Sequence, residues 1–89
     1  MSSEQYREQG IAAAKAKRTD EARKLLAMAV KLNPNDATAW LYLASLISDK
    51  KERLLCLQKV LLIDPANDLA IKAVQALGVD PAQLIALGK

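Results

Sequence analysis

The chain has 89 residues, of which 52% are apolar and 26% are charged, so it can form one domain with a small core and is too apolar to be disordered. Thirteen Lys and Arg and ten Asp and Glu residues give a formal charge of +3. Residues of opposite charge are interspersed along the chain, so it has no long block of one sign, the pattern typical of charged tails. One Trp, two Tyr and no Phe, with Ala and Leu dominant, favour packed helices over sheets. We expect an all-α protein.

The sequence gives no indication of export or membrane insertion. The longest apolar runs, such as Val60 to Ile63, are far shorter than the roughly 20 residues that a membrane-spanning helix needs. The start MSSEQYREQG lacks a basic segment followed by an apolar one, so we expect no secretory signal. The single cysteine, Cys56, cannot form an internal disulfide, which fits a reducing compartment. We therefore expect a cytoplasmic protein with no membrane partner.

The first predicted helix begins after Ser2, which has Gln5 three residues further on, the spacing of a capping box. Small residues such as Gly10 give this helix a face that permits close approach of a neighbour. Basic residues end the helix where its dipole favours positive charge. We expect Thr19 or Asp20 to cap a second, antiparallel helix.

The second helix is predicted by apolar residues at three- and four-residue steps, which place them on one face: Ala22, Leu25, Leu26, Ala29 and Leu32. Pro34 ends this helix, and Asp36 can cap the next one. A third helix follows over about Ala37 to Ile47, and a fourth over about Lys51 to Ile63. The fourth is apolar on all sides, so we expect it to lie centrally.

The chain contains an internal repeat, because residues 20–34 align without gaps on residues 51–65. Asp64-Pro65 repeats Asn33-Pro34, and Asn67-Asp68 is paired with Asn35-Asp36. A fifth helix is predicted to end at Gly78, a residue suited to a left-handed C-cap. A last short helix is expected after Asp80-Pro81, with three apolar residues that would either cover the end of the stack or dock on a neighbour: Leu84, Ile85 and Leu87.

This arrangement resembles the tetratricopeptide repeat, a helix pair with a W-x2-L-G-x2-Y…A-x3-F…P pattern over about 34 residues. Residues of the first unit at pattern positions are Tyr6, Gly10, Ala13, Ala22, Leu26, Ala29 and Pro34. Those of the second unit are Trp40, Leu43, Ala44, Ile47, Leu57, Val60 and Pro65. Arg53 departs from the family by replacing a small Ala, and the second unit is three residues shorter, from which we expect a tighter turn.

The resemblance implies one domain over residues 1–89, an all-α fold in which five to six helices form antiparallel pairs stacked as a short right-handed α-solenoid. Repeat 1 would cover about residues 3–36 and a shortened repeat 2 about residues 37–67. A partial repeat with capping helices would cover about residues 68–87. Solenoids generally need about three repeats for stability, and this chain has barely that number.

The resemblance also implies a concave groove, lined by the first helix of each pair, that binds a peptide or partner helix. The positions expected to line it are Arg7, Ile11, Ala14, Lys15, Thr38, Leu41, Tyr42, Ser45 and Lys72. Tyr42 lies off the apolar stripe of its helix, so it could contact a ligand or be half-buried between helices. Trp40 occupies a packing position, and we expect it to belong to the core.

Some members of the family hold the C-terminal carboxylate of chaperones with Lys, Asn, Asn, Lys and Arg. The corresponding positions here are Arg7, Ile11, Tyr42, Leu69 and Ala73. Only Arg7 is basic, and a carboxylate without charged donors would be poorly paired. We therefore expect no chaperone carboxylate clamp.

Other site classes find no support in the sequence. The chain has no His and one Cys, which removes the usual zinc ligand sets, and it has no glycine-rich phosphate loop. We expect no metal, no cofactor and no enzymatic activity. The basic cluster at residues 15–18 lacks the stacking aromatics of single-strand binders, so we expect no nucleic-acid partner. A structural or self-associating module, whose partner is a second copy or a larger complex, is the alternative to peptide binding.

Overall fold

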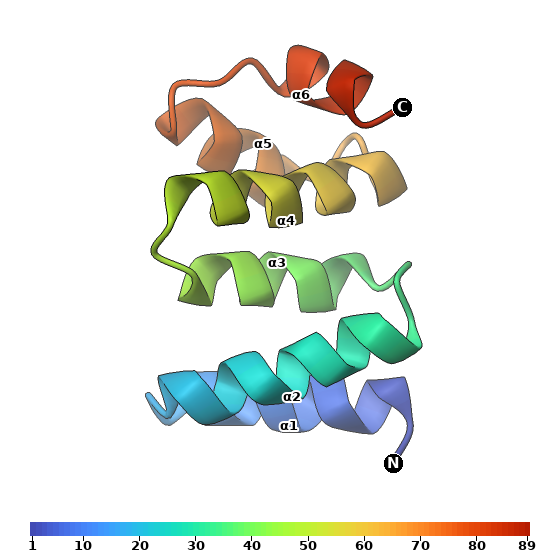
Figure 1. The fold of residues 1–89 in the computed structure, drawn as a ribbon, viewed down its shortest axis with the longest axis vertical. Helices are drawn as coiled ribbons and strands as arrows, with labels where there is room; N and C mark the ends of the chain where they lie inside the picture. The colour runs from blue at the N-terminus through green and yellow to red at the C-terminus, as the bar shows by residue number, and fades with distance from the viewer.

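The computed structural model describes residues 1–89 and contains six α-helices and no strand. They are α1 Ser3–Lys15, α2 Thr19–Leu32, α3 Ala37–Leu46, α4 Lys50–Ile63, α5 Asp68–Ala76 and α6 Pro81–Leu87. The helices stack along the longest axis of a body measuring 35 × 22 × 19 Å, with α1 and α2 at one end and α6 at the other (Figure 1). The predicted all-α fold of stacked helices is confirmed.

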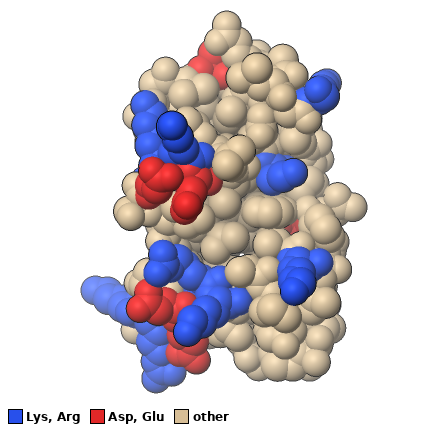
Figure 2. Space-filling model, viewed as in Figure 1, with Lys and Arg blue, Asp and Glu red and all other residues tan.

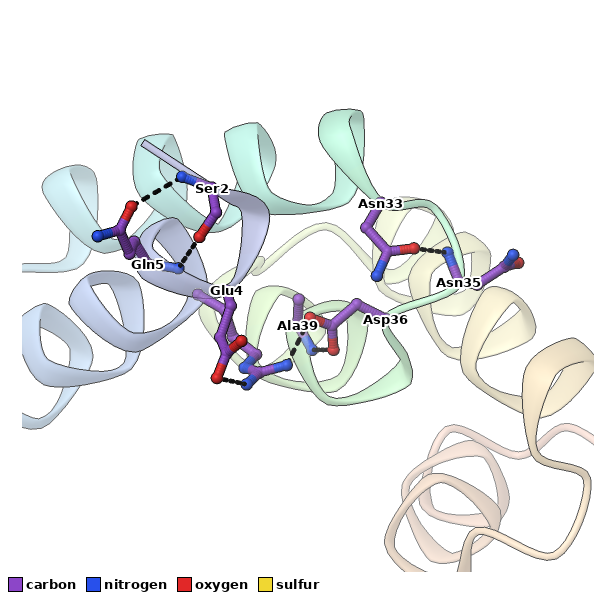
Figure 3. A network of polar contacts seen from close by, with 8 residues as sticks. Ser2, Glu4, Gln5, Asn33, Asn35, Asp36 and Ala39 are labelled. Carbon is purple, nitrogen blue, oxygen red and sulfur yellow. Dashed lines mark hydrogen bonds and ion pairs between the residues drawn. The ribbon is translucent and has the colours of Figure 1, made fainter.

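Helices α1 and α2 form a closely packed hairpin. The backbone N–H of Gln5 donates to Ser2 Oγ at 3.2 Å, and the N–H of Ser2 donates to Gln5 Oε1 at 2.8 Å, which confirms the predicted capping box (Figure 3). Gly10 is buried, and a Cβ added to it would lie 2.7 Å from Cγ of Leu26. The missing side chain of Gly10 therefore allows α1 to approach α2.

The turn after α1 is a Schellman motif built on a non-glycine residue. Lys17 has a φ of 62°. Its N–H donates to the carbonyl of Ala14 at 3.0 Å, and the N–H of Arg18 donates to that of Ala13 at 2.9 Å. These are the two hydrogen bonds of the motif. The chain thus reverses within three residues, at some cost in backbone strain at Lys17.

The predicted cap of α2 is wrong. The helix begins at Thr19 with Arg18 as the N-cap residue, and no side chain caps it. Because the turn brings the chain into helical geometry one residue early, Thr19 and Asp20 already lie in the first turn. Asp20 accepts a hydrogen bond from Arg23 at 2.8 Å instead.

The two links between helix pairs have the same geometry. Asn33 has φ and ψ of −139° and 89°, and Asp64 has −136° and 88°. Each side chain accepts a hydrogen bond of 3.2 Å from the backbone N–H two residues further on. Each link ends on an N-cap residue, Asp36 before α3 and Asn67 before α5. The internal repeat of the sequence is therefore also a repeat of backbone conformation.

One detail of the predicted repeat is shifted by one residue. Asp36 accepts from the N–H of Ala39 at 3.1 Å, and Asn67 accepts from the N–H of Ala70 at 3.0 Å. The equivalent of Asp36 is thus Asn67, whereas Asp68 is the first residue of α5. The pairing of Asn35-Asp36 with Asn67-Asp68 is corrected accordingly, because the cap sits on the residue before the helix whichever polar residue occupies it.

The second unit is shortened in its helix rather than in its turn. Helix α3 has 10 residues, whereas α1 has 13, and α2 and α4 both have 14. The turns at residues 16–18 and 47–49 are equally long. The expected tighter turn is therefore wrong. Helix α3 ends early because Ile47 is extended, with a ψ of 128°, and leads directly to Asp49, the cap of α4.

The core lies between the helix layers and is built mainly of aliphatic side chains. The largest fully buried ones are Leu26, Leu57, Val60, Leu61 and Val74. Three of these five residues belong to α4, which packs against α3, α5 and α6. The central position predicted for α4 is confirmed, although Leu55 on its outer side stays 60% exposed.

The C-terminal helices close one end of the stack. Gly78 has a φ of 79° and follows the C-cap of α5, as predicted. Asp80 caps α6, whose first residue is Pro81. Leu84 is buried, and its carbonyl accepts a hydrogen bond from Gln58 Nε2 at 2.8 Å. Helix α6 therefore packs against the C-terminal half of α4.

Candidate functional site

A cavity of about 310 Å³ opens between α3, α4 and α5, and we call it the α3–α5 cavity. Helix α3 contributes four of its lining residues, and α4 and α5 contribute two each. Six of its eight lining residues are hydrophobic. The lining residues are Leu41, Tyr42, Ala44 and Ser45 from α3, Arg53 and Leu57 from α4, and Leu69 and Ala73 from α5.

Helix α3 has one face buried in the core and another that borders the cavity. Ala39, Leu43 and Ala44 are buried against the core. Leu41 and Tyr42 are half-buried and pack on the edge of that core. Burial of Ala39, Leu43 and Ala44 sets the rotation of α3 about its axis, and with this rotation Leu41 and Tyr42 border the α3–α5 cavity.

Three of the predicted groove residues lie together in this cavity, namely Leu41, Tyr42 and Ser45. The hydroxyl of Ser45 donates to the carbonyl of Tyr42 at 2.6 Å and is therefore engaged within α3. Thr38, on the same helix, is exposed but does not line the cavity.

The remaining predicted residues do not line the cavity. On α1, Ile11 and Ala14 are half-buried, and Lys15 is exposed in the last turn. Arg7 is engaged with Asp36 through a contact of 2.9 Å between Nη1 and Oδ2. Lys72 on α5 is exposed and lies 3.3 Å from the carboxylate of Asp68. The role of these residues in binding stays a prediction.

The sequence-based prediction of the groove omitted the residues of α4 and α5 that line the cavity. In the sequence, Arg53 stands out only as a departure from the family pattern, and Leu69 and Ala73 only as positions of the carboxylate clamp. The available signal was the four-residue spacing of Leu69 and Ala73, which puts both on one face of α5. Leu69 is 66% exposed, so a large apolar side chain faces solvent at the cavity rim.

Trp40 faces a separate hollow. Its indole N–H donates to the carbonyl of Pro34 at 2.8 Å, and the ring packs against the core while remaining partly exposed. The hollow beside it is lined by Pro34, Asn35, Lys59, Leu62 and Ile63 as well. Trp40 therefore ties the first link to the end of α4, in keeping with the predicted packing position.

On the face drawn in Figure 2, most charged side chains gather along one edge with both signs intermixed, and single basic side chains lie apart from it toward the other edge. In Figure 1 this is the edge where α1 turns into α2 and α3 turns into α4. Two ion pairs lie at the first of these turns, Arg18 with Glu21 at 3.7 Å and Arg23 with Asp20 at 2.8 Å. The basic cluster of the sequence is thus partly neutralised by its own neighbours.

Cys56 is buried in α4 and is unpaired. Burial raises the pKa of its thiol, and the negative charge of Glu52 raises that pKa further. A thiol held in the neutral form is a poor nucleophile and a poor metal ligand. Cys56 consequently acts as a small apolar side chain of the core.

The structure has no cluster of three or more His, Cys, Asp or Glu side chains arranged to hold a metal ion. None of the six helices combines the length and the apolar character required to span a membrane. The α3–α5 cavity therefore stands as the candidate site.

The fold and this cavity define a class of protein, a short stack of helical hairpins with a lateral groove. Residues 4–46, which span most of α1 and all of α2 and α3, match the family model described as tetratricopeptide repeat. Residues 4–46 therefore form a tetratricopeptide-repeat module, as the resemblance of the sequence indicated. Neither the curated proteins nor the solved structures gave a match. Such repeats are in general protein–protein interaction modules and typically lack catalytic activity.

Proposed function

We propose that this protein is a cytoplasmic, non-catalytic adaptor that holds a peptide segment of another protein in the α3–α5 cavity. The observation that carries the proposal is the exposed apolar rim of the cavity, where Leu69 is 66% exposed beside Leu41 and Tyr42. Burial of a Leu side chain contributes about 1.5–3 kcal/mol. An apolar partner side chain placed between α3 and α5 would gain contacts with all three residues.

The dimensions of the cavity suit a peptide rather than a large ligand. A volume of about 310 Å³ lies at the lower end of the range of about 300–1,000 Å³ typical of ligand pockets. It therefore accepts one or two side chains, while the peptide backbone would run along the groove. Tyr42 offers apolar ring area together with a hydroxyl group, a combination common in interfaces.

The proposal is tested with a library of random peptides displayed between fixed flanking sequences and selected on the purified protein. Peptides selected in this way should lose at least tenfold in affinity for the variants Leu69→Ser and Tyr42→Ala. Leu55→Ser is the matched control, since Leu55 is exposed to a similar extent at 60% and does not line the cavity. It should bind as the wild type does.

Helicity and thermal melting are compared in the same variants. Leu69→Ser is the more informative of the two, because its side chain is mostly exposed and its loss leaves the core intact. Absence of any selected peptide, or equal loss for Leu55→Ser and Leu69→Ser, would contradict the proposal.

Association with a second copy is the other candidate function, favoured by exposed apolar side chains such as Leu55 and Leu87. Static light scattering over a range of concentrations separates the two functions. A peptide adaptor stays monomeric, whereas a self-associating module gains mass as its concentration rises.

A further inference from the structure

Arg53 is the only charged residue that lines the α3–α5 cavity. Its Nε atom is buried and has no hydrogen-bond partner. It takes part in none of the ion pairs of the structure, which involve four other basic residues. The cavity thus contains one guanidinium group without a partner, surrounded mainly by apolar side chains.

The nearby acidic residues of the chain are engaged elsewhere. Asp49 accepts the N–H of Glu52 as the cap of α4, and Glu52 lines a different hollow, shared with α2. Asp68 lies 3.3 Å from Lys72. The protein therefore offers Arg53 no carboxylate of its own at the cavity.

The buried Nε is out of reach of a ligand, whereas the two Nη groups donate no hydrogen bond within the protein and remain available to an acceptor in the cavity. A carboxylate is the best match to a guanidinium group, because two parallel N–H···O bonds form between planar groups of opposite charge. A single guanidinium also balances a single carboxylate, whereas a doubly charged phosphate would remain only partly compensated.

We infer that the peptide held in the α3–α5 cavity carries an Asp or Glu side chain next to an aliphatic residue, and that Arg53 binds this carboxylate. The inference rests on the proposed function. The aliphatic residue would pack between α3 and α5 near Leu41 and Leu69, while the carboxylate would reach α4. We favour a side-chain carboxylate over a chain end because the positions that hold a chain end in some members of the family carry Tyr42, Leu69 and Ala73 in this cavity.

The groove predicted from the sequence binds its peptide through the first helix of each pair. In the present proposal, the acidic side chain of the peptide is bound by α4, the second helix of its pair. Arg53 stands where the repeat pattern has a small Ala. That substitution both narrows the groove and supplies its charge. The departure from the family pattern therefore becomes a specificity determinant of this particular chain.

The display library described above provides the test, because its fixed flanking sequences exclude free chain ends at the selected positions. Peptides selected on the wild type should be enriched in Asp or Glu within two residues of Leu, Ile, Val or Met. Replacing the acidic residue of a selected peptide by its amide should weaken binding about tenfold or more. The same change should have little effect on binding to Arg53→Gln, whereas Arg53→Glu should select basic residues at that position.

Lys31→Gln is the charge-matched control, since Lys31 is exposed on α2 and lies outside the cavity. It should keep the acidic preference. Thermal melting of Arg53→Gln is measured in parallel and should be close to that of the wild type, because Arg53 makes no ion pair that the variant would lose. A third variant, Arg53→Lys, keeps the charge but not the paired donors and should bind with intermediate affinity.

The outcomes separate this inference from the proposed function. Selected peptides that lack acidic residues, or an acidic preference that survives in Arg53→Gln, would overturn the inference and leave peptide binding intact. Failure to select any peptide would overturn both.

Discussion

The guanidinium group of Arg7 on α1 lies 2.9 Å from the carboxylate of Asp36, the residue that caps α3. The side chain of Asp36 is 5% exposed, and its second oxygen accepts the N–H of Ala39 at 3.1 Å. One buried carboxylate therefore both caps α3 and connects it to the preceding helix pair. This contact helps to fix the helix that carries Leu41 and Tyr42.

Asp36→Ala should lower the free energy of unfolding by about 2–4 kcal/mol, because it removes a helix cap and leaves Arg7 without its partner. Asp36→Asn should cost only about 1–2 kcal/mol, since an amide can keep the cap, as Asn67 does at α5. Urea unfolding followed by far-ultraviolet circular dichroism measures both values. A loss that is the same for both variants would argue against a separate contribution of the helix cap.

The coupling between the two residues is measured by a double-mutant cycle. In the background of Arg7→Ala, the substitution Asp36→Asn should cost clearly less than in the wild type, because the ion pair is already absent. Equal costs in the two backgrounds would show that Arg7 and Asp36 contribute independently.

Gly10→Ala should destabilise the protein by about 1–3 kcal/mol, because the new methyl group would meet Leu26 at 2.7 Å. This loss exceeds the gain of about 1 kcal/mol expected from the better helix propensity of Ala. Gln9→Ala, at an exposed position of the same helix, is the control and should change stability by less than about 0.5 kcal/mol. A gain in stability for Gly10→Ala would refute the close approach of α1 and α2.

Two left-handed positions give opposite predictions. Gly78→Ala should lower stability by about 1–2 kcal/mol, since its φ is 79° and no atom lies within 4 Å of the added Cβ, so that the whole cost is in the backbone. Lys17→Gly should raise stability by up to about 1 kcal/mol by relieving a φ of 62°. Thermal melting of both variants is compared with that of the wild type and shows whether each substitution raises or lowers stability. Changes in the same direction would contradict the left-handed conformation of one of the two residues.

Stability should fall in alkaline solution through Cys56. Its pKa is raised by burial and by Glu52, so the unfolded chain loses the thiol proton before the folded chain does. The contribution of the neutral Cys56 thiol to the free energy of unfolding is complete below the ordinary cysteine pKa of about 8.5. It is lost as the pH rises through the higher pKa of the folded state. Urea unfolding at pH 7 and pH 10 should therefore show a larger decrease for the wild type than for Cys56→Ala. An equal decrease would mean that Cys56 is not held neutral by the fold.

Most helix starts could be predicted because their signals are local. Ser2, Asp36 and Asp80 act on amides two or three residues away, and sequence spacing alone contains that information. The start of α2 could not be predicted in the same way, because it follows from the left-handed conformation of Lys17. Nothing in a lysine side chain indicates that conformation.

The cavity was only partly predictable for a different reason. Leu41, Tyr42 and Ser45 follow from their positions on one helix. Arg53 and Leu69 join them only through the packing of α4 and α5 against α3, which depends on contacts distant in sequence. Arg7 was expected in the groove, yet its ion pair with Asp36 depends on the approach of α1 to the start of α3.

Peptide binding in the α3–α5 cavity is tested most directly by amide NMR shifts during titration of the labelled protein with a peptide selected from the display library. The shifts should concentrate on α3 and α5 around Leu41, Tyr42, Leu69 and Ala73 and on the Nε–H signal of Arg53, with little change on α2 or α6. Shifts centred on α6 or on the outer face of α2, with the Arg53 signal unmoved, would contradict binding at this site.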